Sequence, residues 1–389
     1  MYTTLVSYTI LAVTVSSGTL NLDQGYRNTT EFAAEHGITA KEYKVVTKDG
    51  YILGIFNLPG TRGLPILLMH GLTDSSDTWL IRGNISLGIT LANLGYDVWL
   101  GNLRGNKYSR EHTRLDPERD AAVYWDFSFH ENGYYDLPAT IDLVLEKTGA
   151  SQINAIGHSQ GTTIFFVLAS LRPEYNEKVN LLVAMAPVAF LQYVTPPLST
   201  IIKVSPELIN FGKRLKQYEI FGESITGKAY REVCLKPTIG YLLCAYGYIF
   251  PVAGYDVKEY GYKFHYMLTR QFPMSTSLKN LEHFAQVSRR RSFSAFDYGR
   301  IGNLKVYGTP SPLNYDLKKT TMPVAILCGE SDKLATFKDV LLLKDALPNI
   351  VQFSVVDHNH MNHVDFTWGK TMDKYLYPYI FGILDRFGN

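Results

Sequence analysis

The sequence predicts an α/β protein whose mostly parallel central sheet is flanked by helices and interrupted by a largely helical insertion. Short apolar runs alternate with helical stretches up to about residue 189 of the 389 residues, a pattern typical of parallel sheets. The alternation stops between about Phe190 and Pro310 and resumes in Met322 to Gly329 and Ile350 to Val356. Because about 120 residues are too many for a loop, this stretch predicts a separate cap.

The elements of the predicted core follow one another along the chain. Lys44 to Pro59 predicts a hairpin, because two β-rich runs flank the turn signal Lys48-Asp49-Gly50. Asn132 to Gly149 predicts a helix that stops at its glycine, and Lys374 to Arg386 predicts a closing helix. Continuous apolar runs, as expected for strands buried on both faces, are Leu64 to Met69, Tyr96 to Leu100, Ile153 to Ile156 and Val179 to Ala184.

The N-terminus predicts a secretory signal peptide. The apolar stretch Leu5 to Val15 is too short to span a bilayer, and the small residues Ser16, Ser17 and Gly18 follow it. We therefore expect a signal peptide at 1–18, core at 19–189, the cap at 190–310 and further core at 311–389. The sequons at Asn28 and Asn84 are compatible with secretion and N-glycosylation.

Composition excludes several classes of function. The net charge of +2 gives no electrostatic reason to expect a nucleic-acid partner, and nothing else reaches transmembrane length. The three cysteines fit no zinc spacing. Cys234 and Cys244 are near enough in sequence to pair, whereas Cys328 lies in an apolar run and is expected to be a buried free thiol.

A candidate nucleophile lies where an apolar strand meets an apolar helix. Gly157-His158-Ser159-Gln160-Gly161 is a G-x-S-x-G motif between Ile153 to Ile156 and the helix that begins near Thr162. Glycines two residues before and after Ser159 permit a tight, strained turn that exposes its hydroxyl. This motif, in this context, predicts a nucleophilic serine.

A nucleophilic serine needs a base and an acid that orients the base. In α/β-hydrolases these follow in the order Ser, Asp or Glu, His. Candidate acids follow the expected strand Met322 to Gly329, and candidate bases follow the expected strand Ile350 to Val356. The acid candidates are Glu330 and Asp332, and the base candidates are His358, His360 and His363. Neither choice is decided by residue type or order alone.

The oxyanion hole is expected to use backbone amides. One is that of Gln160, directly after the nucleophile, and the other is that of Leu72, in the loop after the strand that ends at Met69. His70 precedes the serine in the chain, so we expect it to be a structural, hydrogen-bonded residue.

Several stretches together resemble the acid lipases, a family that includes gastric and lysosomal lipases and many insect relatives. They are TKDGYIL (Thr47 to Leu53), HGLTDSSDTW (His70 to Trp79), GYDVWLGNLRGNKYSREH (Gly95 to His112), WDFSF (Trp125 to Phe129), YDLPATID (Tyr135 to Asp142), GHSQGTT (Gly157 to Thr163), FDYG (Phe296 to Gly299) and NHVDFTWG (Asn362 to Gly369).

The resemblance implies a secreted or lysosomal α/β-hydrolase that cleaves esters of neutral lipids at a lipid–water interface. It implies that His363 is the base, that Asp332 is the acid, and that Cys234 pairs with Cys244. No metal or organic cofactor is needed for this chemistry. Two other hypotheses are a lipase-fold protein that binds or transports lipid without turnover, and an esterase for cholesteryl or other lipid esters rather than triacylglycerol.

Overall fold

The computed structural model describes residues 27–388, so the expected signal peptide lies outside the described residues. The main sheet has nine strands. They are β1 (Lys41–Val46), β2 (Tyr51–Leu58), β3 (Arg62–Met69), β4 (Tyr96–Gly101), β5 (Glu111–His112), β6 (Ile153–His158), β7 (Val179–Met185), β10 (Val324–Cys328) and β11 (Ile350–Val355).

The strand order is β1-β2-β4-β3-β6-β7-β10-β11, with β5 paired to β2. From β4 to β11 all neighbours are parallel, whereas β1, β2 and β5 add antiparallel pairs at one end. The predicted α/β fold with a mostly parallel sheet is confirmed. Because parallel strands end at the same edge, the loops after β3, β6, β10 and β11 lie at one edge.

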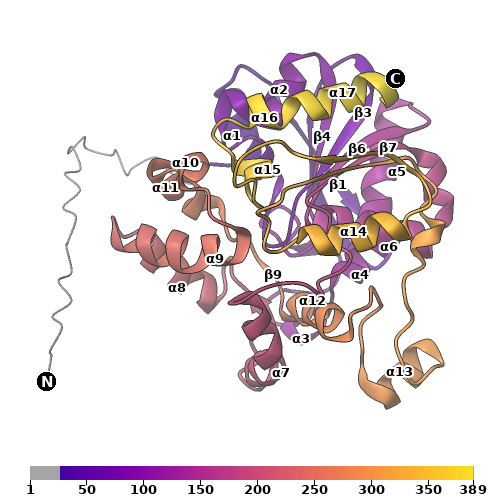
Figure 1. The fold of residues 1–389 in the computed structure, drawn as a ribbon. Helices are drawn as coiled ribbons and strands as arrows, with labels where there is room; N and C mark the ends of the chain where they lie inside the picture. Colours follow the sequence, from indigo (N-terminus) through magenta and orange to yellow (C-terminus); the bar gives the residue numbers. More distant parts are fainter. Residues whose placement is uncertain (1–26, 389) are drawn as a thin grey trace, which may run out of the picture.

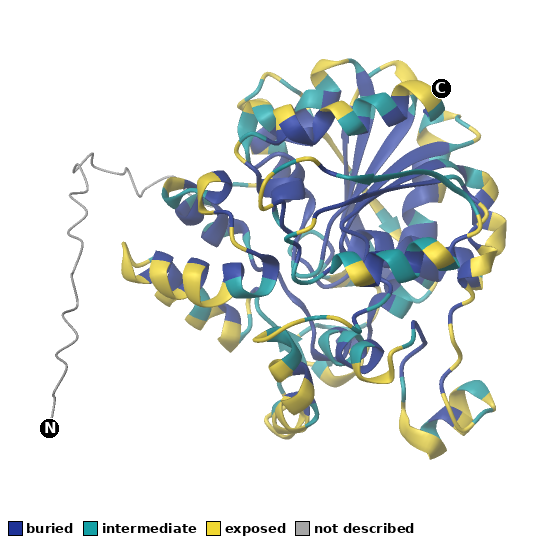
Figure 2. Ribbon diagram, in the orientation of Figure 1, coloured by how far each residue is buried: buried dark blue, intermediate teal, exposed yellow. Residues whose placement is uncertain are grey.

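Helices cover both faces of this sheet (Figure 1). On one face lie α2 (Leu87–Asn93) and α17 (Tyr377–Phe387), and on the other lie α5 (Leu137–Thr148), α6 (Gln160–Leu171) and α14 (Phe337–Ala346). The central strands between them are buried, as Figure 2 shows in dark blue. Apolar burial on both sides explains why these strands are continuous apolar runs in the sequence.

Short elements complete the core. They are α1 (Thr29–Ala34), η1 (Ser76–Trp79), η2 (Gly83–Ile85), α3 (Ala121–Tyr124), α4 (Phe129–Glu131), η3 (Asn132–Asp136), η4 (Pro173–Lys178), η6 (Leu317–Lys319), α15 (Asp365–Trp368) and α16 (Met372–Tyr375).

No helix within residues 27–388 is long and apolar enough to cross a membrane.

Two predicted helices differ in detail from the observed ones. The helix predicted from Asn132 starts with a π-helical turn, η3, before α5, and it ends as expected at Gly149, which has a φ of 71°. The continuous closing helix predicted from Lys374 is wrong at its start. The chain forms α16 and then α17, because Pro378 lacks an amide hydrogen and begins a new helix in its first turn.

Residues 190–310, which we call the cap segment, are mainly helical and lie to one side of the sheet (Figure 1). Their elements are α7 (Leu198–Arg214), β8 (Glu219–Ile220), α8 (Ile225–Cys234), η5 (Tyr241–Ile249), α9 (Phe250–Ala253), α10 (Val257–Tyr260), α11 (Tyr262–Gln271), β9 (Thr276–Ser277), α12 (Leu278–Arg290) and α13 (Gly299–Tyr307). The Cys234–Cys244 disulfide and the buried free thiol of Cys328 are confirmed.

Candidate active site

Ser159 lies in the tight turn between β6 and α6, with a φ of 54° and a ψ of −120°. The glycines beside it are required by close approach of the backbone. A Cβ atom on Gly161 would lie 2.2 Å from the Met69 carbonyl oxygen, and one on Gly157 would lie 2.7 Å from the Gly161 carbonyl oxygen. The motif therefore lets β6, α6 and β3 pack tightly while the serine adopts a strained conformation.

The structure brings Ser159, His363 and Asp332 into one hydrogen-bonded chain. His363 Nε2 lies 2.8 Å from Ser159 Oγ, and His363 Nδ1 lies 2.8 Å from Asp332 Oδ2. With Nδ1–H donating to the carboxylate, Nε2 is free to accept the serine hydroxyl proton. All three residues are buried, with 4–6% of each exposed. The arrangement can deliver a serine nucleophile to a carbonyl carbon.

The other acid and base candidates are not hydrogen-bonded to this Ser159–His363–Asp332 chain. Glu330 is exposed in the same loop as Asp332, and His360 is exposed in the loop before His363. His358 Nε2 is hydrogen-bonded to Asp256 Oδ2 at 3.1 Å. Among the five acid and base candidates, the geometry thus joins only Asp332 and His363 to Ser159.

Asp332 is oriented by its own loop. Its Oδ1 accepts hydrogen bonds from the backbone amides of Leu334 and Ala335, each at 2.8 Å. This leaves Oδ2 to accept from His363. Two amides on one oxygen thus hold the carboxylate in the orientation that a base-fixing acid needs.

The expected oxyanion donors lie on both sides of the serine. Gln160 is the first residue of α6, where helix amides have no partner within the helix. On the other side, a Cβ atom on Gly71 would lie 3.3 Å from Ser159 Cβ, so the loop that carries Leu72 passes against the serine. The first turn of α6 and the loop that carries Leu72 therefore both lie against Ser159, and the role of the Gln160 and Leu72 amides as oxyanion donors remains a prediction.

Two buried histidines support the site without joining the chain. His70 donates from Nδ1 to the Gly71 carbonyl at 2.8 Å and accepts from the Leu103 amide at Nε2, which confirms its expected structural role. His158 donates from Nε2 to the His363 carbonyl at 2.8 Å. Burial lowers the pKa of His70 to about 4 and, with repulsion from His363, that of His158 to about 3. Both rings therefore stay neutral near pH 7.

The cap segment also contributes backbone groups that the sequence did not reveal. The Ala253 carbonyl accepts hydrogen bonds from the amides of His363 and Lys333, at 3.1 and 3.3 Å. A Cβ atom on the next residue, Gly254, would lie 2.5 Å from the Ser331 carbonyl oxygen and 2.6 Å from Asn362 Cβ. The segment at Ala253 is thus inserted between the loop of the acid and the loop of the base.

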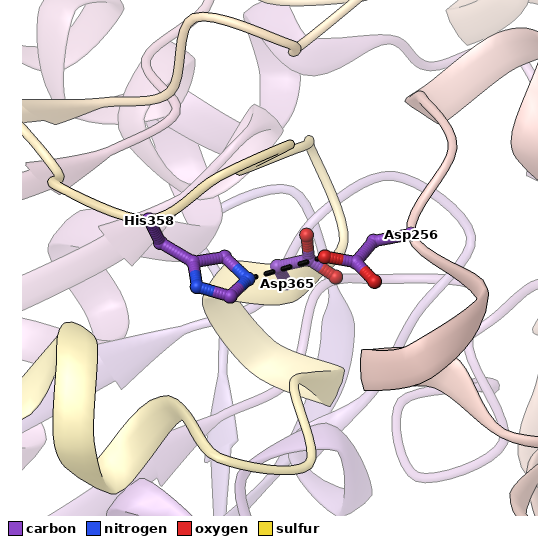
Figure 3. A group of neighbouring side chains, drawn as sticks. All are labelled: Asp256, His358 and Asp365. Carbon is purple, nitrogen blue, oxygen red and sulfur yellow. Dashed lines mark hydrogen bonds and ion pairs between the residues drawn. The ribbon is translucent and has the colours of Figure 1, made fainter.

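A second link joins the cap segment to the loop that carries His363. Asp256, His358 and Asp365 lie together, with the potential ligand atoms within 4.8 Å of one another, and within residues 27–388 they are the one such group (Figure 3). Asp365 also accepts the Asn362 amide at 3.0 Å. Burial, together with the negative charge of Asp256, raises the pKa of Asp365 well above its usual range. Through the His358–Asp256 contact and the hydrogen bond from Asn362 to Asp365, this group bridges the cap segment and the loop that carries His363.

The two expected glycosylation sites lie at the surface. Asn28 is exposed at the N-cap of α1, and Asn84 is exposed in η2 before α2. A glycan on either asparagine remains a prediction.

Comparison with known proteins gives the family. Residues 65–367 match the family described as alpha/beta hydrolase fold, and residues 29–83 match the family described as a partial alpha/beta-hydrolase lipase region. The crystal structure of epoxide hydrolase VrEH1 from Vigna radiata is similar with a TM-score of 0.52 and 15% identity, covering 90% of this chain and 98% of that one. At that identity it supports the fold alone.

Similar curated proteins are lipases. The chain is 35% identical to Lipase 1 of Drosophila melanogaster, covering 91% of this chain and 78% of that protein. It is 36% identical to gastric triacylglycerol lipase of Rattus norvegicus (90% and 89% covered). It is 33% identical to lysosomal acid lipase/cholesteryl ester hydrolase of Homo sapiens (92% and 91% covered). The resemblance noted in the sequence is confirmed. The chain belongs to the family of lipases with the alpha/beta-hydrolase fold, and it is a carboxylic ester hydrolase.

Proposed function

We propose that the protein is a secreted or lysosomal lipase that hydrolyses ester bonds of neutral lipids through an acyl-enzyme on Ser159. The observation that carries the proposal is the pair of 2.8 Å contacts that connect Ser159 to His363 and His363 to Asp332. A serine hydrogen-bonded to a histidine, which is in turn hydrogen-bonded to an aspartate, is the arrangement that acyl transfer needs.

In the first half of the reaction, Ser159 Oγ attacks the ester carbonyl carbon while His363 Nε2 takes the hydroxyl proton. Asp332 stabilises the imidazolium that forms. The amides of Leu72 and Gln160 donate to the tetrahedral oxyanion, and each donor contributes on the order of 3 kcal/mol to transition-state stabilisation. His363 then protonates the leaving alcohol as the carbon–oxygen bond breaks, and an acyl ester remains on Ser159.

In the second half, water replaces the alcohol. His363 takes a proton from the water, whose oxygen attacks the acyl carbon, and then returns a proton to Ser159 Oγ as the fatty acid leaves. Every proton in this cycle is moved by one imidazole, so the chemistry requires no metal ion or organic cofactor.

Neutral lipid esters are the substrates that the relatives and the surface of the chain support. The named relatives include a triacylglycerol lipase and a cholesteryl ester hydrolase. Large apolar side chains are exposed on the cap segment, where Figure 2 colours much of α7, α8 and α13 yellow. They include Leu208 and Phe211 on α7 and Leu215 directly after it, each more than half exposed. An exposed apolar helix with basic neighbours suits contact with a lipid–water interface.

We also propose a signal peptide, domain boundaries and two glycosylation sites for the chain. Residues 1–18 are a signal peptide, the core comprises 19–189 and 311–389, and 190–310 form a cap over the site. Asn28 and Asn84 carry glycans. Two bonds from Ala253 to the loops of the acid and the base support the cap's position next to the site.

The test is hydrolysis of triolein and cholesteryl oleate emulsions from pH 4 to 8 by the wild type and S159A. We expect the wild type to release fatty acid from at least one emulsion and S159A to fall by about 10⁴-fold or more. S159A with activity close to the wild type would overturn the assignment of the nucleophile. Lipid binding without hydrolysis by the wild type would favour the second hypothesis, a lipid-binding protein without turnover.

A further inference from the structure

We infer that Asn280, in the cap segment, is a positioning residue for the oxyanion hole. It acts on the side chain of Gln160, the residue whose backbone amide is one of the two proposed oxyanion donors. The inference rests on the proposed function and adds to it that the cap is needed for the chemical step as well as for covering the substrate.

Asn280 lies in the first turn of α12 and is fully buried. Its Nδ2 donates to Gln160 Oε1 at 2.9 Å and to Thr276 Oγ1 at 3.1 Å. Its Oδ1 accepts from the Phe129 amide at 2.8 Å. Both donors and the acceptor of the amide are therefore used, which fixes its orientation and that of the groups bonded to it.

Both polar atoms of the Gln160 side-chain amide are hydrogen-bonded. While Oε1 accepts from Asn280, Nε2 donates to Asn132 Oδ1 at 3.3 Å. Gln160 is only 3% exposed, so water does not replace either partner readily. Because Gln160 directly follows Ser159 and starts α6, fixing its side chain also fixes the direction of its backbone N–H.

The polar chain continues from Asn132 toward the other oxyanion donor. Asn132 Nδ2 donates to Asp136 Oδ2 at 2.9 Å. The same carboxylate accepts from the backbone amide and the Nε of Arg104, at 3.1 and 2.8 Å. The residue before Arg104, Leu103, donates its amide to Nε2 of His70.

His70 closes the chain at the loop of Leu72. Its Nδ1 donates to the Gly71 carbonyl at 2.8 Å, next to the amide of Leu72. One connected set of buried polar groups thus runs from the cap segment through Gln160 to the second donor. Preorganised donors stabilise an oxyanion only if they are held in place before the reaction, and Asn280 is the cap's contribution to this set.

The cap also bonds to the second loop directly. The backbone amide of Met274 donates to the Thr73 carbonyl at 2.7 Å, and Thr73 has a φ of 56°. Two residues before Asn280, α12 begins, and its N-cap Ser277 bonds to the Phe127 carbonyl. The cap segment therefore restrains the loops on both sides of Ser159, and among the side-chain hydrogen bonds of residues 27–388 the one from Asn280 joins the cap segment to Gln160.

The test uses N280A and N280D, with N303A as the matched control. N280D keeps the size of the side chain and an oxygen that accepts from the Phe129 amide, but a carboxylate cannot donate to Gln160. Asn303, in α13, is also a buried asparagine of the cap segment, and its Nδ2 donates to Asp297 before this helix and to the Pro310 carbonyl after it. N303A therefore removes comparable hydrogen bonds without touching Gln160.

Three quantities are measured on the full-length enzyme with p-nitrophenyl butyrate: kcat, KM and the Ki of an alkyl trifluoromethyl ketone. The ketone forms a hemiketal oxyanion on a nucleophilic serine. We expect both Asn280 variants to lose about 10- to 100-fold in kcat with KM within twofold, and their Ki to rise by the same factor. N303A should keep kcat and Ki within twofold even where its melting temperature falls.

Other results overturn the inference. These are an unchanged kcat and Ki in N280D and N280A, a rise in KM alone, or equal losses in N303A. Wild type and S159A are assayed in the same series. If the wild type does not hydrolyse the ester, or if S159A does, the proposed function itself fails. If those two behave as expected and N280D resembles the wild type, only the role of Asn280 fails.

Discussion

The core and the cap segment differ in the exposure of their apolar residues and in their charge. The central strands of the core are apolar and buried; in β3, for example, Ile66, Leu67 and Leu68 have no exposed surface. The cap segment leaves many large apolar residues exposed and contains 16 of the 38 basic residues but only 8 of the 36 acidic ones. The cap segment still packs apolar residues such as Phe250 and Leu268 into the common hydrophobic core, and specific polar contacts with the core add to this packing.

The candidate site lies where the two regions meet. The core supplies Ser159, His363 and Asp332 on loops after parallel strands. The cap supplies groups that restrain those loops, such as the Ala253 carbonyl and the Asn280 amide. The three candidate catalytic side chains thus come from the core. Their positions are restrained by contacts with both the core and the cap segment.

The largest expected effect is in the core and distinguishes two neighbouring carboxylates. D332N should lower kcat for p-nitrophenyl butyrate by about 10⁴-fold, because the amide no longer fixes His363 in the tautomer that accepts the serine proton. E330Q, two residues away and exposed, should keep kcat within twofold. Steady-state kinetics of both variants tests the choice, and similar losses in the two would contradict it.

The next largest effect is expected at the contact between cap and core. G254A adds a Cβ atom that would lie 2.5 Å from the Ser331 carbonyl oxygen and 2.6 Å from Asn362 Cβ, at a φ of 119°. The loops of the acid and the base must then move apart, so kcat should fall by about 100-fold, as expected for a displacement near 1 Å.

G261A is the control for this substitution. Gly261 also has a positive φ, of 73°, but a Cβ atom there would meet nothing within 4 Å. It should lower the free energy of unfolding by about 1 kcal/mol through backbone strain and leave kcat within twofold. Equal losses of kcat in G254A and G261A would show that strain, and not the contact with the two loops, causes the effect.

The pH dependence of stability should have opposite signs at a buried histidine of the cap and a buried aspartate of the core. Burial lowers the pKa of His283 to about 3. The unfolded chain therefore binds a proton below pH 6.5 that the folded chain does not. Relative to H283Q, the wild type should lose about 2 kcal/mol of unfolding free energy between pH 6.5 and 5, as measured by urea denaturation.

Asp74 provides the contrast. Burial raises its pKa to about 7, so the folded chain keeps a proton that the unfolded chain releases above about pH 4. Relative to D74N, the wild type should gain stability as the pH falls from 7 toward 4. The difference in unfolding free energy between wild type and H283Q, or between wild type and D74N, is expected to change with pH. If it does not, the burial of that histidine or aspartate is contradicted.

The smallest expected effect is on the exposed side of the cap. L208Q changes a side chain on α7 that is 55% exposed, so the free energy of unfolding should change by less than about 0.5 kcal/mol. Hydrolysis of a triolein emulsion should fall by about fivefold, because less apolar surface enters the lipid. Activity on soluble p-nitrophenyl butyrate should stay the same, and a parallel loss on both substrates would argue against a role at the interface.

The sequence predicted the core better than the cap for a physical reason. Buried parallel strands require continuous apolar runs, and the turn at Ser159 requires glycines at fixed positions, so both leave a readable pattern. The order of Asp332 and His363 was also readable, but residue type and order did not choose among three histidines, and the family resemblance did. The cap's contribution was not readable, because a carbonyl such as that of Ala253 has no residue signature and a single asparagine such as Asn280 has no periodic pattern.

The position of a covalent label tests most directly whether Ser159 is the nucleophile. The enzyme is treated with a fluorophosphonate, digested, and analysed by peptide mass spectrometry, with D332N and E330Q treated in parallel. We expect a single adduct on Ser159 that forms rapidly in the wild type and in E330Q and much more slowly in D332N. An adduct on another residue, or labelling of Ser159 at equal rates in all three proteins, would contradict it.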